Sequence, residues 1–168
     1  MTRMDTDKGS GLGAGVNQIT EKVIGCAFAV GKVLGPGFLE KVYENALVHE
    51  LRKAGLRVEQ QKRITIWYDG VIVGDYIADV LVEDGVLVEV KAKKAIIDDH
   101  VSQSLNYLAA TNLPVCLLLN FAKRVEIKRI AGPNAPRLDV SHPCPSVPSV
   151  AAFHKAPVIT HPDDFEEV

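Results

Sequence analysis

The sequence predicts an α/β fold with a mixed β-sheet and helices packed against it. Two segments near the N-terminus repeat apolar residues with the period of a helix, and the segments after them alternate like strands separated by Asp-Gly turns. A strand–helix–strand order follows, in which the last strand is apolar throughout, as is typical of a crossover between parallel strands. Because hairpin neighbours run antiparallel and crossover neighbours run parallel, we expect both kinds of pair in one sheet.

The helical segments are read from apolar stripes and the strands from turn signals. Residues 19–34 place apolar side chains at steps of four or three residues, and Gly35-Pro36-Gly37 ends that pattern before a second helix over 38–54. The later segments are predicted as three strands, a helix and two more strands, over 58–68, 71–83 (irregular near Gly74-Asp75), 86–92, 98–111, 114–121 and 125–130.

Composition divides the chain into three parts. Residues 1–16 are rich in glycine and polar residues, which predicts a flexible N-terminal segment. Residues 131–168 hold most of the prolines and show no helical or strand period, which predicts a disordered tail. The folded domain is therefore expected over residues 17–130.

Charge and cysteine content narrow the classes of protein. Hydrophobic residues make up 47 % of the 168 residues and the net charge is −2, so a protein held on nucleic acid mainly by bulk positive charge is excluded. The three cysteines lack paired spacing, which argues against a disulfide framework or a zinc site. With no signal peptide or membrane-length apolar run, we expect a cytoplasmic protein without membrane association.

A charged strand carries the strongest chemical signal. Glu89 and Lys91 are two residues apart, so they share one face of the strand over 86–92. Asp79 lies in the preceding strand among apolar neighbours, where a carboxylate needs a specific reason to be present. Two carboxylates and a lysine brought together across a hairpin suit a Mg²⁺ site for phosphate chemistry. The alternative is an ordinary amphipathic strand with its charges in water.

The register of this hairpin tests the metal hypothesis. A strict two-residue turn at Asp84-Gly85 would pair Asp79 with Val90 and place Glu89 on the opposite face. Direct pairing of Asp79 with Glu89 needs a three-residue loop or a bulge, and we predict such an irregularity.

A second motif lies at the start of the helix over 38–54. Residues 37–43 read GFLEKVY, which is the pattern GxxExxY, and Asp79 followed by Glu89-Val90-Lys91 looks like the core of a PD-(D/E)XK nuclease. With these motifs in order, residues 17–130 resemble the bacterial GxxExxY protein family, which is assigned to the PD-(D/E)XK superfamily.

The resemblance implies a restriction-endonuclease-like fold, a mixed β-sheet flanked by helices. It also implies that Asp79 and Glu89 are metal ligands, that Lys91 is the catalytic lysine, and that Glu40 lies beside the metal. For Glu40 the alternative is a solvated helix charge. Tyr43 is interpreted as a packed aromatic residue.

Gln103 and Tyr107 lie one turn apart on the helix over 98–111. They resemble the QxxxY motif of the exonuclease branch of the superfamily, which implies that both lie near the site and the substrate backbone. The alternative is an exposed glutamine beside a half-buried tyrosine.

The sequence thus predicts a nuclease that hydrolyses phosphodiester bonds, with DNA as the expected partner and Mg²⁺ or Mn²⁺ as the cofactor. Two alternatives stay open. One is a catalytically silent module of the same fold that binds nucleic acid or a protein partner, and the other is a metal hydrolase acting on small phosphates.

Overall fold

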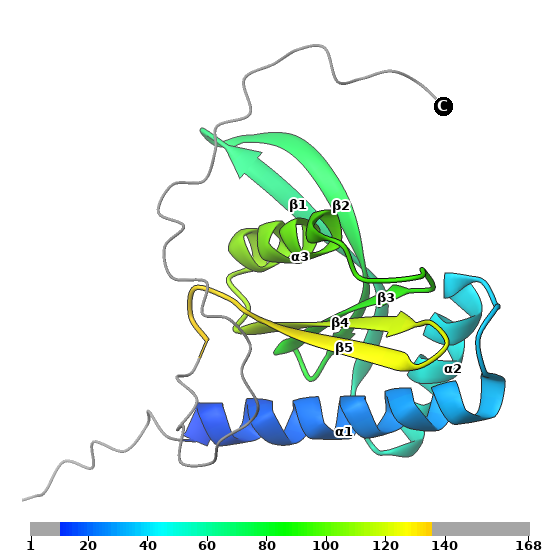
Figure 1. Ribbon diagram of the computed structural model, residues 1–168. Helices are drawn as coiled ribbons and strands as arrows, with labels where there is room; N and C mark the ends of the chain where they lie inside the picture. The colour runs from blue at the N-terminus through cyan, green and yellow to red at the C-terminus, as the bar shows by residue number, and fades with distance from the viewer. Residues whose placement is uncertain (1–10, 136–168) are drawn as a thin grey trace, which may run out of the picture. The chain divides into compact units, whose positions relative to one another are not determined.

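The computed structural model describes residues 11–135 of the chain, with side chains from residue 15 onward. Within these residues the elements follow one another as α1 (Gly11–Leu34), α2 (Glu40–Lys53), β1 (Val58–Tyr68), β2 (Val71–Val82), β3 (Val86–Lys91), α3 (Asp98–Thr111), β4 (Val115–Phe121) and β5 (Val125–Ala131). The five strands form one sheet in the order β1-β2-β3-β4-β5 (Figure 1).

The sheet is mixed, as predicted. β3 and β4 pair in parallel across the α3 crossover, whereas every other neighbouring pair is antiparallel. β4 is buried on both faces, because α1 and α2 cover one face of the sheet and α3 the other (Figure 1). These surfaces are called the α1/α2 face and the α3 face below.

Each face of the sheet has its own apolar cluster. On the α1/α2 face, Val80, Val88 and Leu117 pack with residues of both helices. On the α3 face, Leu87 and Leu118 pack with Tyr107 and Leu108 of α3. The active-site candidates therefore lie in a sheet whose two faces are both covered by helices.

Helix α1 begins earlier than its sequence suggests. The structure starts it at Gly11, so residues 11–16 of the expected flexible segment are helical. Val16 is buried and lies three residues before Ile19, so it extends the apolar stripe by about one turn. Burial of this side chain favours helix where the glycines alone disfavour it. The tail was expected from residue 131, but Ala131 belongs to β5. Residues 1–10 and 136–168 lie outside the described residues.

Strands β1 and β2 form a hairpin longer than the rest of the sheet. Only Val80–Val82 of β2 pair with β3, so the outer part of the hairpin is an arm beyond the third strand (Figure 1). The register shifts between Ile66 and Trp67, which leaves Val73 of β2 without a partner. This bulge adjoins Gly74, where the sequence predicted an irregularity.

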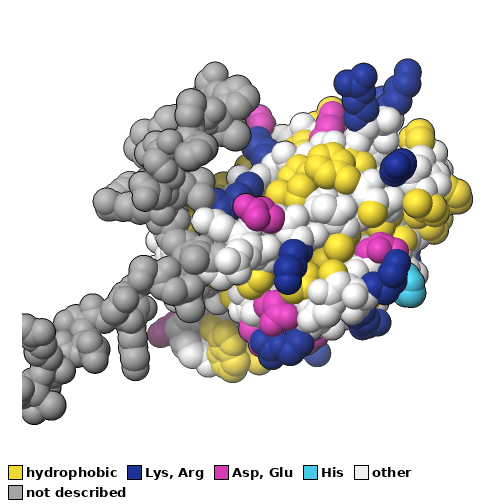
Figure 2. Space-filling view, turned by 90° about the horizontal axis from the view of Figure 1, so that it is seen from below, with side chains coloured by type: hydrophobic (Ala, Val, Ile, Leu, Met, Phe, Trp, Pro, Cys, Tyr) yellow, Lys and Arg dark blue, Asp and Glu magenta, His cyan; other side chains and the backbone are white. Residues whose placement is uncertain are grey.

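Surface charge on the α1 side is mixed. Figure 2 shows Lys and Arg side chains interspersed with Asp and Glu around apolar patches, in keeping with the near-neutral net charge. None of the helices in residues 11–135 is both long enough and apolar enough to cross a membrane.

Candidate active site

The β2–β3 connection is a three-residue loop, one of the two irregularities that the metal hypothesis allowed. Val82 pairs with Val86, and Val80 with Val88, so Glu83, Asp84 and Gly85 form the loop. The same register places Asp79 opposite Glu89. The predicted irregularity is therefore confirmed, and both carboxylates lie at one level of the sheet.

Arg57 contacts both acidic residues of this loop. Glu83 and Asp84 both have positive φ, 49° and 53°, which is unfavourable for residues with a Cβ. Arg57 pairs with both of them, through Nε to Glu83 at 3.1 Å and through a terminal nitrogen to Asp84 at 3.1 Å. Its backbone N–H also donates to the Glu83 carboxylate at 2.7 Å. These contacts join the loop to the start of β1.

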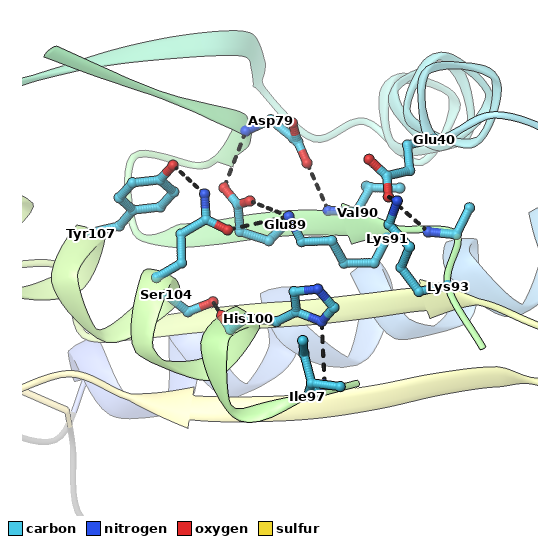
Figure 3. A network of polar contacts seen from close by, with 12 residues as sticks. Glu40, Asp79, Glu89, Val90, Lys91, Lys93, Ile97, His100, Ser104 and Tyr107 are labelled. Atoms are coloured by element: carbon cyan, nitrogen blue, oxygen red, sulfur yellow. Dashed lines mark hydrogen bonds and ion pairs between the residues drawn. The ribbon is translucent and has the colours of Figure 1, made fainter. Parts of the chain in front are cut away.

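The regular backbone pairing of β2 with β3 ends at Val80. At Asp79 and Glu89, side-chain carboxylates accept the hydrogen bonds of the backbone N–H groups instead. The Asp79 carboxylate accepts from the Val90 N–H at 2.8 Å, and the Glu89 carboxylate accepts from the Asp79 N–H at 3.4 Å. Figure 3 shows the two acidic side chains facing one another across this gap. The site therefore lies where β2 and β3 separate.

The side-chain alternation of β2 also changes at this point. Ala78 belongs to the cluster on the α3 face, whereas Val80, two residues later, belongs to the cluster on the α1/α2 face. In regular strands such residues share a face. Opposite Asp79 in β1, Gln61 has a φ of 56°, so both strands are irregular at this level.

Burial dominates the electrostatics of the pair. Glu89 is 2 % exposed, and burial, with Asp79 as the next cause, raises the pKa of its carboxyl to about 8. Burial likewise raises the pKa of Asp79, partly opposed by its hydrogen bond from Val90. Two carboxylates confined together favour a bound cation, because a positive ion relieves both the desolvation and the mutual repulsion.

Lys91 and the predicted QxxxY pair form one chain of contacts. The Lys91 ammonium lies 3.7 Å from the Glu89 carboxylate and donates to the Gln103 side-chain oxygen at 3.2 Å. The Gln103 amide donates in turn to the Tyr107 hydroxyl at 2.8 Å. The structure thus brings β3 and α3 together as the QxxxY interpretation predicted, and Tyr107 is 3 % exposed rather than half-buried.

Glu40 stands at the other side of Lys91. Its carboxylate accepts from the Ala92 N–H at 3.3 Å and lies 3.5 Å from the Lys93 ammonium (Figure 3). It is half-buried and bonded across the structure, which differs from a solvated helix charge. It contacts the segment after β3 rather than the two carboxylates themselves.

Tyr43 helps to orient the helix start that carries Glu40 toward the segment after β3. Its ring is buried and stacks on Phe121 of β4, with centroids 4.6 Å apart, as expected for a packed aromatic residue. Its hydroxyl donates to the Gly35 carbonyl at 2.6 Å and accepts from the Phe38 N–H at 3.2 Å. Gly37 has a φ of 109°, which favours glycine. Gly37 and Tyr43 of the GxxExxY motif therefore determine the conformation of the helix start, which carries Glu40.

Two polar residues near the site were not singled out from the sequence. Glu44, 4 % exposed, accepts from Lys41, Gln60 and Gln61 at 2.7–2.8 Å. Its place one turn after Glu40 was the available signal, because such residues share a helix face.

Asn120 is the second residue of this kind. It is fully buried at the end of β4, and its side chain bonds the Lys93 N–H at 2.9 Å and the Lys93 carbonyl at 3.0 Å. It therefore fixes the segment that Glu40 contacts. A single polar residue in the apolar run of 115–121 was the signal in the sequence.

The donor set suits a hard divalent cation held by two carboxylates. Mg²⁺ is commonly bound through one or two carboxylates, with water completing its shell, and Asp79 and Glu89 supply these oxygens. Across the part of the chain that the structure describes, no three Asp, Glu, His or Cys side chains gather closely enough to hold a metal ion. Direct ligation by Glu40 therefore stays a prediction.

Two surface hollows flank the Lys91 end of β3. One, of about 310 Å³, is lined by Phe38, Leu39, Glu40, Lys41, Ala92 and Lys93. The other, of about 270 Å³, is lined by Tyr76, Asp99, Ser102, Gln103, Asn106 and Tyr107. The polar network thus connects two open surfaces.

Comparison with known proteins identifies the family. Residues 17–130 match the PD-(D/E)XK nuclease superfamily, and the chain belongs to it. The predicted fold class, a restriction-endonuclease-like mixed sheet flanked by helices, is confirmed by the sheet topology and the family. PD-(D/E)XK nucleases generally use divalent metal ions.

Two solved structures are similar to this chain. The crystal structure of SSO0001 has 16 % identity and a TM-score of 0.49; the match covers 70 % of this chain and 62 % of that one, so this chain spans less than two thirds of its length. An alkaline exonuclease (LHK-Exo) from Laribacter hongkongensis has 14 % identity and a TM-score of 0.42, covering 77 % of this chain and 72 % of that one. No curated protein matches the chain in sequence.

Proposed function

We propose that this protein is a divalent-metal-dependent nuclease that hydrolyses phosphodiester bonds of DNA. The observation that supports this most directly is the joint position of Asp79, Glu89 and Lys91 where β2 and β3 separate. The resemblance of residues 37–43 to the GxxExxY motif implies that Glu40 also lies beside the metal. A nuclease superfamily member with this side-chain set has the groups that the reaction needs.

Asp79 and Glu89 would hold Mg²⁺ or Mn²⁺. When bound, the ion supplies a more acidic water and neutralises charge that develops on the phosphate. Both side chains are already held in place by backbone hydrogen bonds, so they need little rearrangement to bind the ion.

Lys91 is proposed as the catalytic lysine. Its ammonium stands beside the carboxylates, where it orients the attacking water and stabilises negative charge on the phosphate oxygens. Gln103 accepts a hydrogen bond from this ammonium and is itself oriented by Tyr107, so both act as positioning residues. Glu40 orients Lys93 and the backbone after β3 at the substrate side.

The proposal is tested by cleavage of single-stranded, duplex and branched DNA, and of RNA, with Mg²⁺ or Mn²⁺. We expect cleavage by the full chain, lowered about a hundredfold or more by Lys91→Ala. Lys94→Ala, an exposed lysine three residues further on, is the matched control and should cleave normally.

Cleavage that survives Lys91→Ala would point to a contaminating nuclease. Absence of cleavage with every metal and nucleic acid, together with no metal-induced rise in melting temperature, would favour the catalytically silent binding module instead.

A further inference from the structure

The hollow beside the arm has an aromatic wall. Tyr76 of β2 is 48 % exposed, and its ring lies 5.5 Å from that of Tyr107, tilted by 55°. The opposite side of this hollow comes from the outer surface of α3, through Ser102 and Asn106 among others. An exposed tyrosine ring beside a surface recess offers a flat face to a planar ligand.

This hollow is directly linked to the proposed catalytic lysine. Tyr107 and Gln103 line it, and Gln103 is also the side chain that accepts the Lys91 hydrogen bond. Tyr76 itself lies three residues before Asp79 in the same strand. A group bound in the hollow would therefore lie one side chain away from the reacting phosphate.

The lining chemistry suits a nucleobase better than a phosphate. The hollow contains two amides, a serine hydroxyl and the Asp99 carboxylate, and no Lys, Arg or His among its lining residues in the described part of the chain. A carboxylate without a cation disfavours phosphate, whereas carboxylates and amides pair with the amino and ring-nitrogen groups of bases. Base stacking on an aromatic ring adds affinity that does not depend on net positive charge.

The hollow on the other side of Lys91 has the complementary character. Lys41 and Lys93 line it together with Glu40, and their ammonium groups lie beside the carboxylates of Glu44 and Glu40. Ammonium groups are the usual contacts of the phosphate backbone. The two hollows thus place base-binding chemistry and backbone-binding chemistry on opposite sides of the same lysine.

We propose that Tyr76 and the outer surface of α3 bind an unpaired base of the substrate next to the bond that is cleaved. The substrate class is therefore single-stranded nucleic acid, or a duplex with an unpaired end, because a base within an intact duplex cannot expose its face to a tyrosine ring. This inference rests on the proposed nuclease function for its substrate, but its binding test does not require cleavage.

The test is binding of the full chain, without divalent cations, to a labelled mixed-sequence DNA single strand and to the same sequence as a blunt duplex. Fluorescence anisotropy should show preference for the single strand. Tyr76→Ala should weaken single-strand binding about tenfold, within the range measured for loss of one stacked base, and leave duplex binding unchanged. Tyr76→Phe, which keeps the ring, should bind like the unchanged protein.

Ile77→Ala is the matched control, because Ile77 is the next residue, is 56 % exposed and lies on the opposite face of the arm. The inference is overturned if Tyr76→Ala behaves like Ile77→Ala, if it weakens both DNA forms equally, or if the unchanged protein does not bind single strands. Tyr76-dependent binding without cleavage would reject the nuclease proposal and keep the base site. Cleavage with Tyr76-independent binding would do the reverse.

Discussion

The two faces of β3 are both buried from Val86 to Val90 but differ in chemistry. On the α1/α2 face, Val86, Val88 and Val90 are at most 1 % exposed. On the α3 face, Leu87 is followed by Glu89, 2 % exposed, and then by Lys91. Burial alone therefore does not distinguish a stabilising face from a functional one.

The difference lies in how each face satisfies its side chains. The valines contact other apolar residues, which stabilises the fold in proportion to the area removed from water. The charged residues depend on a few specific hydrogen bonds, and the raised pKa values of Glu89 and Asp79 show that ionising them there is unfavourable. We infer that the valines of β3 contribute stability, from which the buried charges on its other face subtract.

The largest expected effect is on the stabilising face. Leu117 of β4 is fully buried there, and Leu117→Ala should lower the free energy of unfolding by about 3 kcal/mol, because it removes apolar contacts and leaves a cavity. Urea denaturation measures this. A loss below about 0.5 kcal/mol, the range of a surface substitution, would contradict the stabilising role of this face.

A divalent cation should stabilise the protein by neutralising the buried carboxylates of Asp79 and Glu89. At a Mn²⁺ concentration of about a hundred times its dissociation constant, the gain in stability is about 2.7 kcal/mol, visible as a higher melting temperature. Asp79→Asn should abolish this rise. Asp69→Asn, which removes an equal charge from the turn between β1 and β2, should retain it; loss of the rise in both variants would contradict a site at Asp79.

Removing the buried charge should stabilise the chelator-treated protein. Glu89→Gln is expected to raise the free energy of unfolding by about 1 kcal/mol at pH above 8, because the wild-type carboxylate is then ionised in a buried position. The sign follows from the raised pKa: the unfolded chain releases the proton first, so wild-type stability falls as pH rises from the ordinary glutamate range to about 8.

The same gain should vanish below the ordinary pKa of glutamate, where the carboxyl is protonated in both states. Urea denaturation across this pH range provides the measurement. A lower free energy of unfolding for Glu89→Gln than for the wild type at high pH would show that the ionised carboxylate stabilises the protein. That result would contradict the inference that buried charge on this face of β3 lowers stability.

The smallest effect concerns the helix start that aims Glu40. Tyr43→Phe keeps the stack on Phe121 but removes the hydroxyl that bonds Gly35 and Phe38, which should cost about 1 kcal/mol in urea denaturation. Tyr68→Phe, on an exposed ring, should have no measurable effect. Equal stability of both variants would mean that the hydroxyl does not hold the junction.

Much of this architecture was readable from the sequence because it depends on local periodicity. The helix over 98–111 was predicted with the bounds observed for α3, and the apolar run at 114–121 identified β4 within one residue. The irregular connection before β3, predicted as a three-residue loop or a bulge, followed from the metal hypothesis and strand geometry, because a strict two-residue turn would place the two carboxylates on opposite faces. The start of α1 was misjudged, since the burial of Val16 outweighs the low helix propensity of the glycines.

The sequence by itself determined which residues carry charge, their spacing, and the strands and helices on which they lie. Only the tertiary structure decided that Gln103 meets Lys91, that Glu40 turns to Ala92 and Lys93, and that Glu44 and Asn120 are buried at the site. These contacts join residues from separate helices and strands. The direction of each side chain in them depends on packing and on local irregularities of the strands, such as the one at Asp79. Periodicity predicts on which face of a helix or strand a residue lies. Which residues of two elements contact one another is decided only when the whole chain packs.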